Sequence, residues 1–189
     1  MLTLTVRRSL LLFLSSCLVI GFAASGVAAQ AKPPAPADSH LVAPPVLAKL
    51  LPAPDGWTRG EVQPNQVDDA SGCNYTVASV VYTKDALRVK ITIADTGAHA
   101  ESLMAVASMI AILPDDFDGT VPPATTIKRM KIDGSPASEM WNADKMTGEI
   151  TILLSGRFVV AVEAQKADGP EVLRAMLALV DVKAVAALK

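Results

Sequence analysis

One segment, residues 87–93, alternates strictly between apolar and polar side chains and constrains the fold more than any other part of the chain. The apolar residues are Leu87, Val89, Ile91 and Ile93, and the polar residues between them are Arg88, Lys90 and Thr92. A period of two residues places these sets on opposite faces of a β-strand. Antiparallel sheets commonly bury one face and leave the other in water, so the segment predicts an antiparallel sheet.

Further patterns along the chain predict an α+β domain. Hairpin signals lie at Lys84-Asp85 and Asp133-Gly134. Seven strands are expected, over residues 58–63, 75–82, 87–94, 126–132, 137–142, 149–154 and 157–164. One helix is expected over residues 98–113, and another after Asp168-Gly169-Pro170, with Asp181 as the cap of a short final turn. The order βββαββββα predicts an antiparallel sheet of about six to seven strands with two helices packed on one face.

The first thirty residues have the composition of an export signal. Arg7-Arg8 form a positive region, residues 10–22 are mostly apolar, and small residues follow. We expect cleavage near Ala29 or Ala31; the alternatives are an uncleaved anchor and a lipoprotein lipidated at Cys17. The sequence thus predicts a periplasmic or secreted protein of the bacterial envelope, without a transmembrane span after signal-peptide cleavage.

Composition divides the rest of the chain into a leader and one folded domain. Seven of the thirteen prolines lie in residues 32–54, and such a segment favours an extended leader. The expected boundaries are 1–29 for the signal peptide, 30–55 for the proline-rich leader and 56–189 for the domain. Cleavage of the signal peptide would remove Arg7 and Arg8 and leave 15 basic residues against 19 acidic ones. The sequence has no stripe of basic residues that would indicate a nucleic-acid partner.

Motifs for metals, cofactors and familiar catalysis are missing from the sequence. The histidines are His40 and His99, and Cys73 is the one cysteine that remains after signal cleavage. The sequence has no HExxH, GxSxG, Walker or GxGxxG motif. This favours a non-enzymatic protein with no metal and no cofactor, and leaves an unfamiliar enzyme open.

The tripeptide Asp95-Thr96-Gly97 resembles the active-site motif of aspartic proteases, in which each aspartate is half of a carboxylate dyad. A chain with one such motif would act as a homodimer, as retropepsins do, with residues 153–157 as its second element. The alternative is structural: Asp95 ends a strand, and Thr96-Gly97 turn into a helix. Ser155 within the second element, His99 and the helical pattern of residues 98–113 favour the structural alternative.

Short motifs within residues 50–189 resemble a group of small, exported, uncharacterised bacterial proteins. The motifs are Leu50-Leu51-Pro52 leading to Gly56-Trp57, the strand that ends in Asp95-Thr96-Gly97, the strand Gly156-Arg157-Phe158-Val159-Val160, and Val180-Asp181-Val182. This resemblance implies a periplasmic domain without a known activity. The element order is also similar to the Mog1/PsbP-like fold, whose members are mainly accessory or assembly proteins.

Three aromatic residues are candidates for a binding surface: Trp57, Tyr82 and Trp141. The alternative is that they anchor the core. Taken together, the sequence predicts a non-enzymatic binding or accessory domain whose partner is an envelope protein or a small ligand. A homodimeric retropepsin-like protease that uses Asp95 is the alternative function, and a structural spacer is a third.

Overall fold

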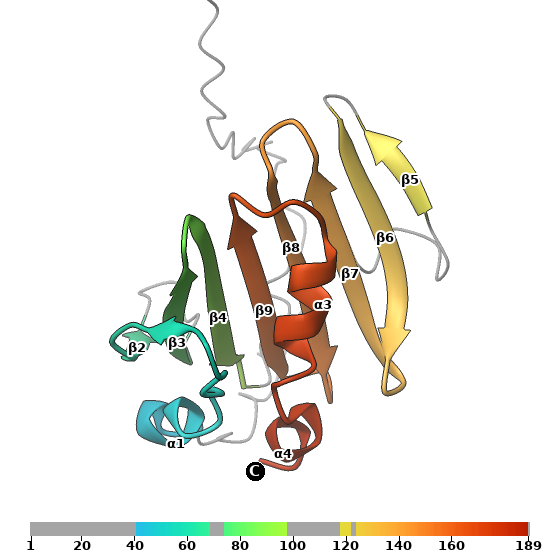
Figure 1. Cartoon of the computed structure of the whole chain (residues 1–189). Coiled ribbons are helices and arrows are strands. Elements are labelled where there is room, and N and C mark those ends of the chain that lie inside the picture. Colours follow the sequence, from blue (N-terminus) through green and yellow to red (C-terminus); the bar gives the residue numbers. More distant parts are fainter. Residues whose placement is uncertain (1–40, 69–73, 98–117, 122–123, 189) are drawn as a thin grey trace, which may run out of the picture. The chain divides into compact units, whose positions relative to one another are not determined.

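The computed structural model describes residues 41–68, 74–97, 118–121 and 124–188, and its main feature is one antiparallel sheet (Figure 1). Nine strands of the described residues form it: β1 (Thr58–Arg59), β2 (Gln63–Asp68), β3 (Asn74–Lys84), β4 (Leu87–Asp95), β5 (Asp118–Val121), β6 (Thr125–Ile132), β7 (Ser135–Asn142), β8 (Thr147–Leu154) and β9 (Phe158–Gln165). Their order is β1-β3-β4-β9-β8-β7-β6-β5, and β2 also pairs with β3. The predicted antiparallel α+β class is confirmed.

The alternation in β4 behaves as the sequence predicts. Val89, Ile91 and Ile93 are each fully buried, whereas Arg88 on the other face is exposed. The register aligns Ile91 with Val80 of β3 and with Val162 of β9. Directly opposed residues lie on the same face of a sheet, so each such row adds apolar side chains from neighbouring strands to one core.

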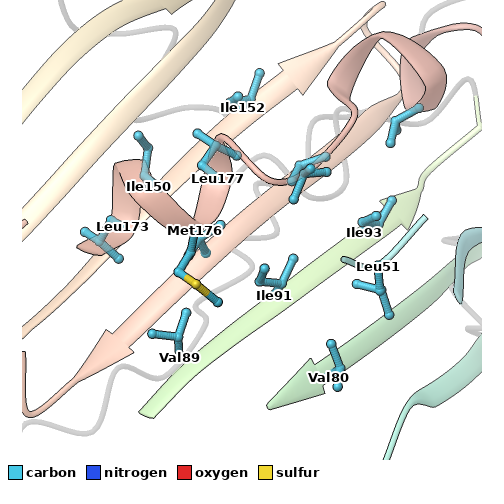
Figure 2. Close-up of a cluster of buried hydrophobic side chains, with 14 of the residues drawn as sticks. Leu51, Val80, Val89, Ile91, Ile93, Ile150, Ile152, Leu173, Met176 and Leu177 are labelled. Atoms are coloured by element: carbon cyan, nitrogen blue, oxygen red, sulfur yellow. The ribbon is translucent and has the colours of Figure 1, made fainter. Parts of the chain in front are cut away.

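Three short helices lie within the described residues: α1 (Pro44–Ala48), α3 (Glu171–Leu177) and α4 (Val182–Ala186). Figure 2 shows Leu173, Met176 and Leu177 of α3 beside the strands that carry Ile91 and Ile150. Asp181 caps α4 as expected, because its Oδ1 accepts a hydrogen bond of 2.9 Å from the backbone N–H of Ala184. In the described part of the chain, none of the helices has the length and apolar content that crossing a bilayer requires.

The strand count and the helices differ in detail from the prediction. β2 and β5 were not expected, because Gln63–Asp68 carries a proline and no apolar alternation, and Asp118–Val121 has only four residues. Both lie at edges of the sheet, where a strand pairs on one side only. The helix predicted over residues 98–113 lies outside the described residues. α1 lies in the segment that the sequence analysis assigned to the proline-rich leader.

The folded unit begins N-terminal to residue 56, where the sequence analysis placed its start. Val42, Leu47 and Leu51 are 8%, 0% and 5% exposed and belong to the same core cluster as the strands. Proline in the first turn favours α1 because the ring fixes φ and the missing N–H has no helical partner there. The proline-rich composition of this stretch therefore coexists with three buried apolar side chains, which hold it on the sheet.

Candidate functional site

Asp95 lies at the end of β4 and is completely buried. Its Oδ1 accepts hydrogen bonds from Nε of Arg157 at 2.7 Å and from the backbone N–H of Gly97 at 2.9 Å. Its Oδ2 accepts from Nη2 of Arg157 and from the backbone N–H of Val42, each at 2.7 Å. Thr76 also holds Val42, because its hydroxyl donates a hydrogen bond of 2.7 Å to the Val42 carbonyl. We call this arrangement the Asp95 clamp.

The Asp95 clamp keeps the carboxylate charged. Burial by itself raises the pKa of Asp95, but hydrogen bonds from Arg157, Val42 and Gly97, with the charge of Arg157, outweigh it and hold the pKa below its usual value. The same ion pair raises the pKa of Arg157 through the hydrogen bond to Asp95. A carboxylate has about four acceptor positions, and four hydrogen bonds occupy them here.

Arg157 is brought to Asp95 by the turn between β8 and β9. Ser155 and Gly156 have φ values of 53° and 64°, and the N–H of Arg157 donates to the Leu154 carbonyl at 3.0 Å. Thr96 secures the turn, because its N–H and hydroxyl both donate to the carbonyl of Arg157, at 3.1 and 2.8 Å. The two segments that the sequence analysis compared with protease elements do meet, but as a salt bridge between Asp95 and Arg157.

The three candidate aromatic residues do not gather on one surface. Tyr82 is fully buried, and its hydroxyl donates to the Pro52 carbonyl at 2.6 Å; burial raises its pKa, although Arg59 acts in the opposite direction. Trp57 is half-buried against the core, immediately before β1. Trp141 lies on β7, which β4, β9 and β8 separate from β3. Tyr82 therefore anchors the core rather than a surface.

Trp141 packs over a position that has no side chain. Gly148 lies directly opposite it on β8, and a Cβ at Gly148 would come within 2.6 Å of Cε3 of Trp141. The same Cβ would lie 3.0 Å from Cδ1 of Leu173 on α3. The indole is thus partly buried against the core near the start of α3, on the helix-covered face of the sheet.

A groove lies between the C-terminal helices and β6. α3 packs on β8 and β9 and does not lie over β6 (Figure 1). The groove encloses about 340 Å³, at the small end of the range for ligand pockets. We call it the α3–β6 groove; the residues that line it are Met130, Ile132, Asp133, Ile150, Arg174, Leu177, Ala178, Val180 and Val182. Only two of these residues are charged, so the groove is an apolar surface with a few polar groups.

A second buried carboxylate lies beneath this groove. Glu139 of β7 is 2% exposed and faces the core, because the register sets it opposite Ile150. Arg174 of α3 donates from Nε to its Oε2 and from Nη2 to its Oε1, each at 2.6 Å. The hydrogen bonds that Arg174 donates to Glu139 raise the pKa of Arg174. The side chain of Arg174 remains 47% exposed, so its guanidinium lies at the groove wall. The carboxylate of Glu139 lies in the protein interior.

Glu139, Arg174 and the groove were not among the candidates that the sequence offers. β7 has the sequence Ser-Pro-Ala-Ser-Glu-Met-Trp-Asn, in which apolar and polar residues do not alternate. The sequence therefore does not show which face of the strand Glu139 occupies. Its inward position follows only from the pairing register of β7 with β8. Arg174 could have been noticed in the sequence, because it is a charged residue between the apolar residues Val172, Leu173 and Met176 of α3. Nothing in the sequence indicated that these two residues form a pair.

A pocket on the opposite face of the sheet is the other cavity of interest, and its wall includes Met140 and Trp141 as well as polar residues. It also encloses about 340 Å³, and Glu149 and Glu163, which are directly opposed in β8 and β9, contribute to its wall. Nζ of Lys90 pairs with Glu163 at 3.1 Å, and both side chains are more than 40% exposed, at 43% and 41%. Water screens such a pair, so this face has the character of an ordinary solvated sheet surface.

Neither metal ligands nor relatives identify the site. Among the residues that the structure describes, no three His, Cys, Asp or Glu side chains are grouped so that they could hold a metal ion. Comparison with protein-family models, with curated proteins and with solved structures finds no match to this chain. Function is therefore inferred from the geometry of the groove and of the two ion pairs.

Proposed function

We propose that this chain is an exported, periplasmic or secreted binding domain without catalytic activity, and that its ligand site is the α3–β6 groove. Export is supported by the signal-like residues 1–30 and by the resemblance of residues 50–189 to small exported bacterial proteins. The binding role is supported by one observation above others: a groove with seven apolar side chains and a fixed, half-exposed arginine in its wall. Apolar concavities with a few well-placed polar groups are the usual form of ligand sites.

The alternative function, a homodimeric retropepsin-like protease, has less support from the site. Such an enzyme requires Asp95 to share a proton with a second aspartate and to activate water. The carboxylate of Asp95 is instead paired with Arg157, and four donors occupy its acceptor positions. A carboxylate held in this way is suited to binding the Val42 segment, so we assign Asp95 a structural role.

A substitution at Ala178 tests the groove without disturbing the core. Ala178 lines the groove, is exposed, and follows the last residue of α3. We expect that Ala178→Phe fills the groove and weakens binding of an uncharged fluorescent probe, N-phenyl-1-naphthylamine, at least tenfold in the full chain. The probe's emission, titrated against protein, gives the affinity.

Ala187→Phe is the matched control for this experiment. Ala187 is also exposed and also follows the last residue of a short helix, α4, but it does not line the groove. The control should bind the probe as the unmodified chain does. The proposal fails if the unmodified chain does not bind the probe, or if the two variants bind it equally well.

A further inference from the structure

The guanidinium of Arg174 is held so that one end of it faces away from its partner. The carboxylate of Glu139 accepts hydrogen bonds from Nε and Nη2 of Arg174, at 2.6 Å each. This is the side-on arrangement of a planar guanidinium with a carboxylate. Among the described residues, no hydrogen-bond acceptor is found for Nη1. Its two N–H groups are therefore available at the groove wall, where the side chain is 47% exposed.

The charges around this donor exclude a strongly anionic partner. Glu139 neutralises Arg174, and Asp133, the other charged residue of the groove wall, adds a further negative charge. Lys128 lies opposite Glu139 on β6, but its Nζ pairs with Asp118 at 3.0 Å. A bound carboxylate would make the cluster more negative in a partly buried place, whereas an uncharged acceptor would add no charge.

A cationic ligand does not suit the site either. Asp133 would attract it, but the donor in the wall, Nη1 of Arg174, is itself cationic and can only donate. The rest of the wall consists of apolar side chains, among them Met130, Leu177 and Val182. The chemistry that satisfies both parts is an apolar chain that carries an uncharged carbonyl oxygen.

Building on the proposed groove, we propose that its ligand is an uncharged amphiphile with an acyl amide group, whose carbonyl oxygen accepts hydrogen bonds from Nη1 of Arg174. The alkyl chain lies against Met130, Ile132 and Leu177. The N–H group of the amide can donate a hydrogen bond to the carboxylate of Asp133, which only accepts hydrogen bonds. A second carbonyl group in the ligand could not do so.

Three compounds with the same chain length test the head group: hexanamide, hexanoate and hexylamine. Each displaces N-phenyl-1-naphthylamine from the full chain at pH 7, and the displacement gives its dissociation constant. A hydrogen bond to a charged donor distinguishes a ligand by about tenfold, so hexanamide should bind about tenfold more tightly than the other two. Equal affinities, or tighter binding of hexanoate or hexylamine, overturn the proposal.

A double variant, E139L/R174L, separates this proposal from the proposed function. Removing Arg174 alone would leave Glu139 without its cationic partner, but replacing both members by apolar residues is often neutral or stabilising. We expect the double variant to lose the tenfold preference for hexanamide over hexanoate and hexylamine. If the preference persists, Arg174 is not the donor. If the unmodified chain binds neither the probe nor any of the three compounds, the proposed function itself fails.

Discussion

The two buried ion pairs, Asp95–Arg157 and Glu139–Arg174, are alike in geometry and different in surroundings. Each joins a carboxylate that is at most 2% exposed to an arginine through two short hydrogen bonds. Two backbone N–H groups complete the shell of Asp95, and its arginine is only 22% exposed. Arg174 is 47% exposed and lines an apolar groove. A saturated pair fixes the chain, whereas a pair with a spare donor beside a cavity is able to bind a ligand.

The largest expected effect is at the saturated pair. Arg157→Leu leaves Asp95 charged, buried and without its cationic partner, which should lower the free energy of unfolding by about 3–5 kcal/mol. Urea denaturation followed by circular dichroism measures this loss. Arg88→Leu, at an exposed arginine on the other face of β4, is the control and should change stability by less than about 0.5 kcal/mol. A loss below about 1 kcal/mol for Arg157→Leu would show that the Asp95 clamp is not structural.

The corresponding change at the groove should cost less. Arg174→Leu also removes a partner from a buried carboxylate, but the site of Arg174 is half open, so water can hydrate Glu139 in its place. We expect a loss of about 1–3 kcal/mol in the same denaturation experiment. The comparison between the two pairs breaks down if Arg174→Leu destabilises the chain more than Arg157→Leu does.

Acid should weaken the Asp95 clamp in a defined direction. The pKa of Asp95 is lower in the folded state than its ordinary value of about 3.9, so the unfolded state takes up a proton first as the pH falls. Its contribution to stability is therefore present above about pH 4 and is lost as the pH falls through the folded-state pKa. Unfolding free energies measured between pH 7 and pH 2 should decline more steeply below pH 4 for the unmodified chain than for Asp95→Asn. Equal slopes would mean that Asp95 does not carry this linkage.

The smallest effects come from two threonines that differ in their partners. Thr76→Val removes the hydroxyl that holds the Val42 carbonyl and should cost about 1–2 kcal/mol. Thr92 lies on the opposite face, and its buried hydroxyl oxygen has no hydrogen-bond partner among the described residues. Thr92→Val should therefore be neutral or slightly stabilising, because it removes an unsatisfied polar atom. Chemical denaturation of both variants checks the difference, and a greater loss for Thr92→Val would contradict it.

The sequence indicated the central strands and missed what depends on register. The alternation of β4 and the Asp133-Gly134 turn predicted a correct hairpin architecture, because such local patterns fix which side chains face inward. Proline content suggested that residues 41–52 belong to a solvated leader, yet three buried side chains and Asp95 hold them on the sheet. Local composition does not report such long-range contacts.

The candidate site shows the same limit more sharply. Asp95 attracted attention as a motif, but its role depends on Arg157, 62 residues further along the chain. Glu139 and Arg174 are 35 residues apart, and neither belongs to a motif. Pairs of this kind become visible only when the strand order and the position of α3 are known.

The most direct test of the account is to map ligand binding on the full chain by nuclear magnetic resonance. Hexanamide is titrated into labelled protein, and the backbone amide signals are followed. The account predicts shifts at residues 130–133, 150 and 174–182, which surround the α3–β6 groove, and none at residues 42, 95–97 and 157 of the Asp95 clamp. Shifts centred on the Asp95 clamp, or no shifts at any concentration, would contradict the central claim that the Glu139–Arg174 pair, and not the Asp95–Arg157 pair, serves binding.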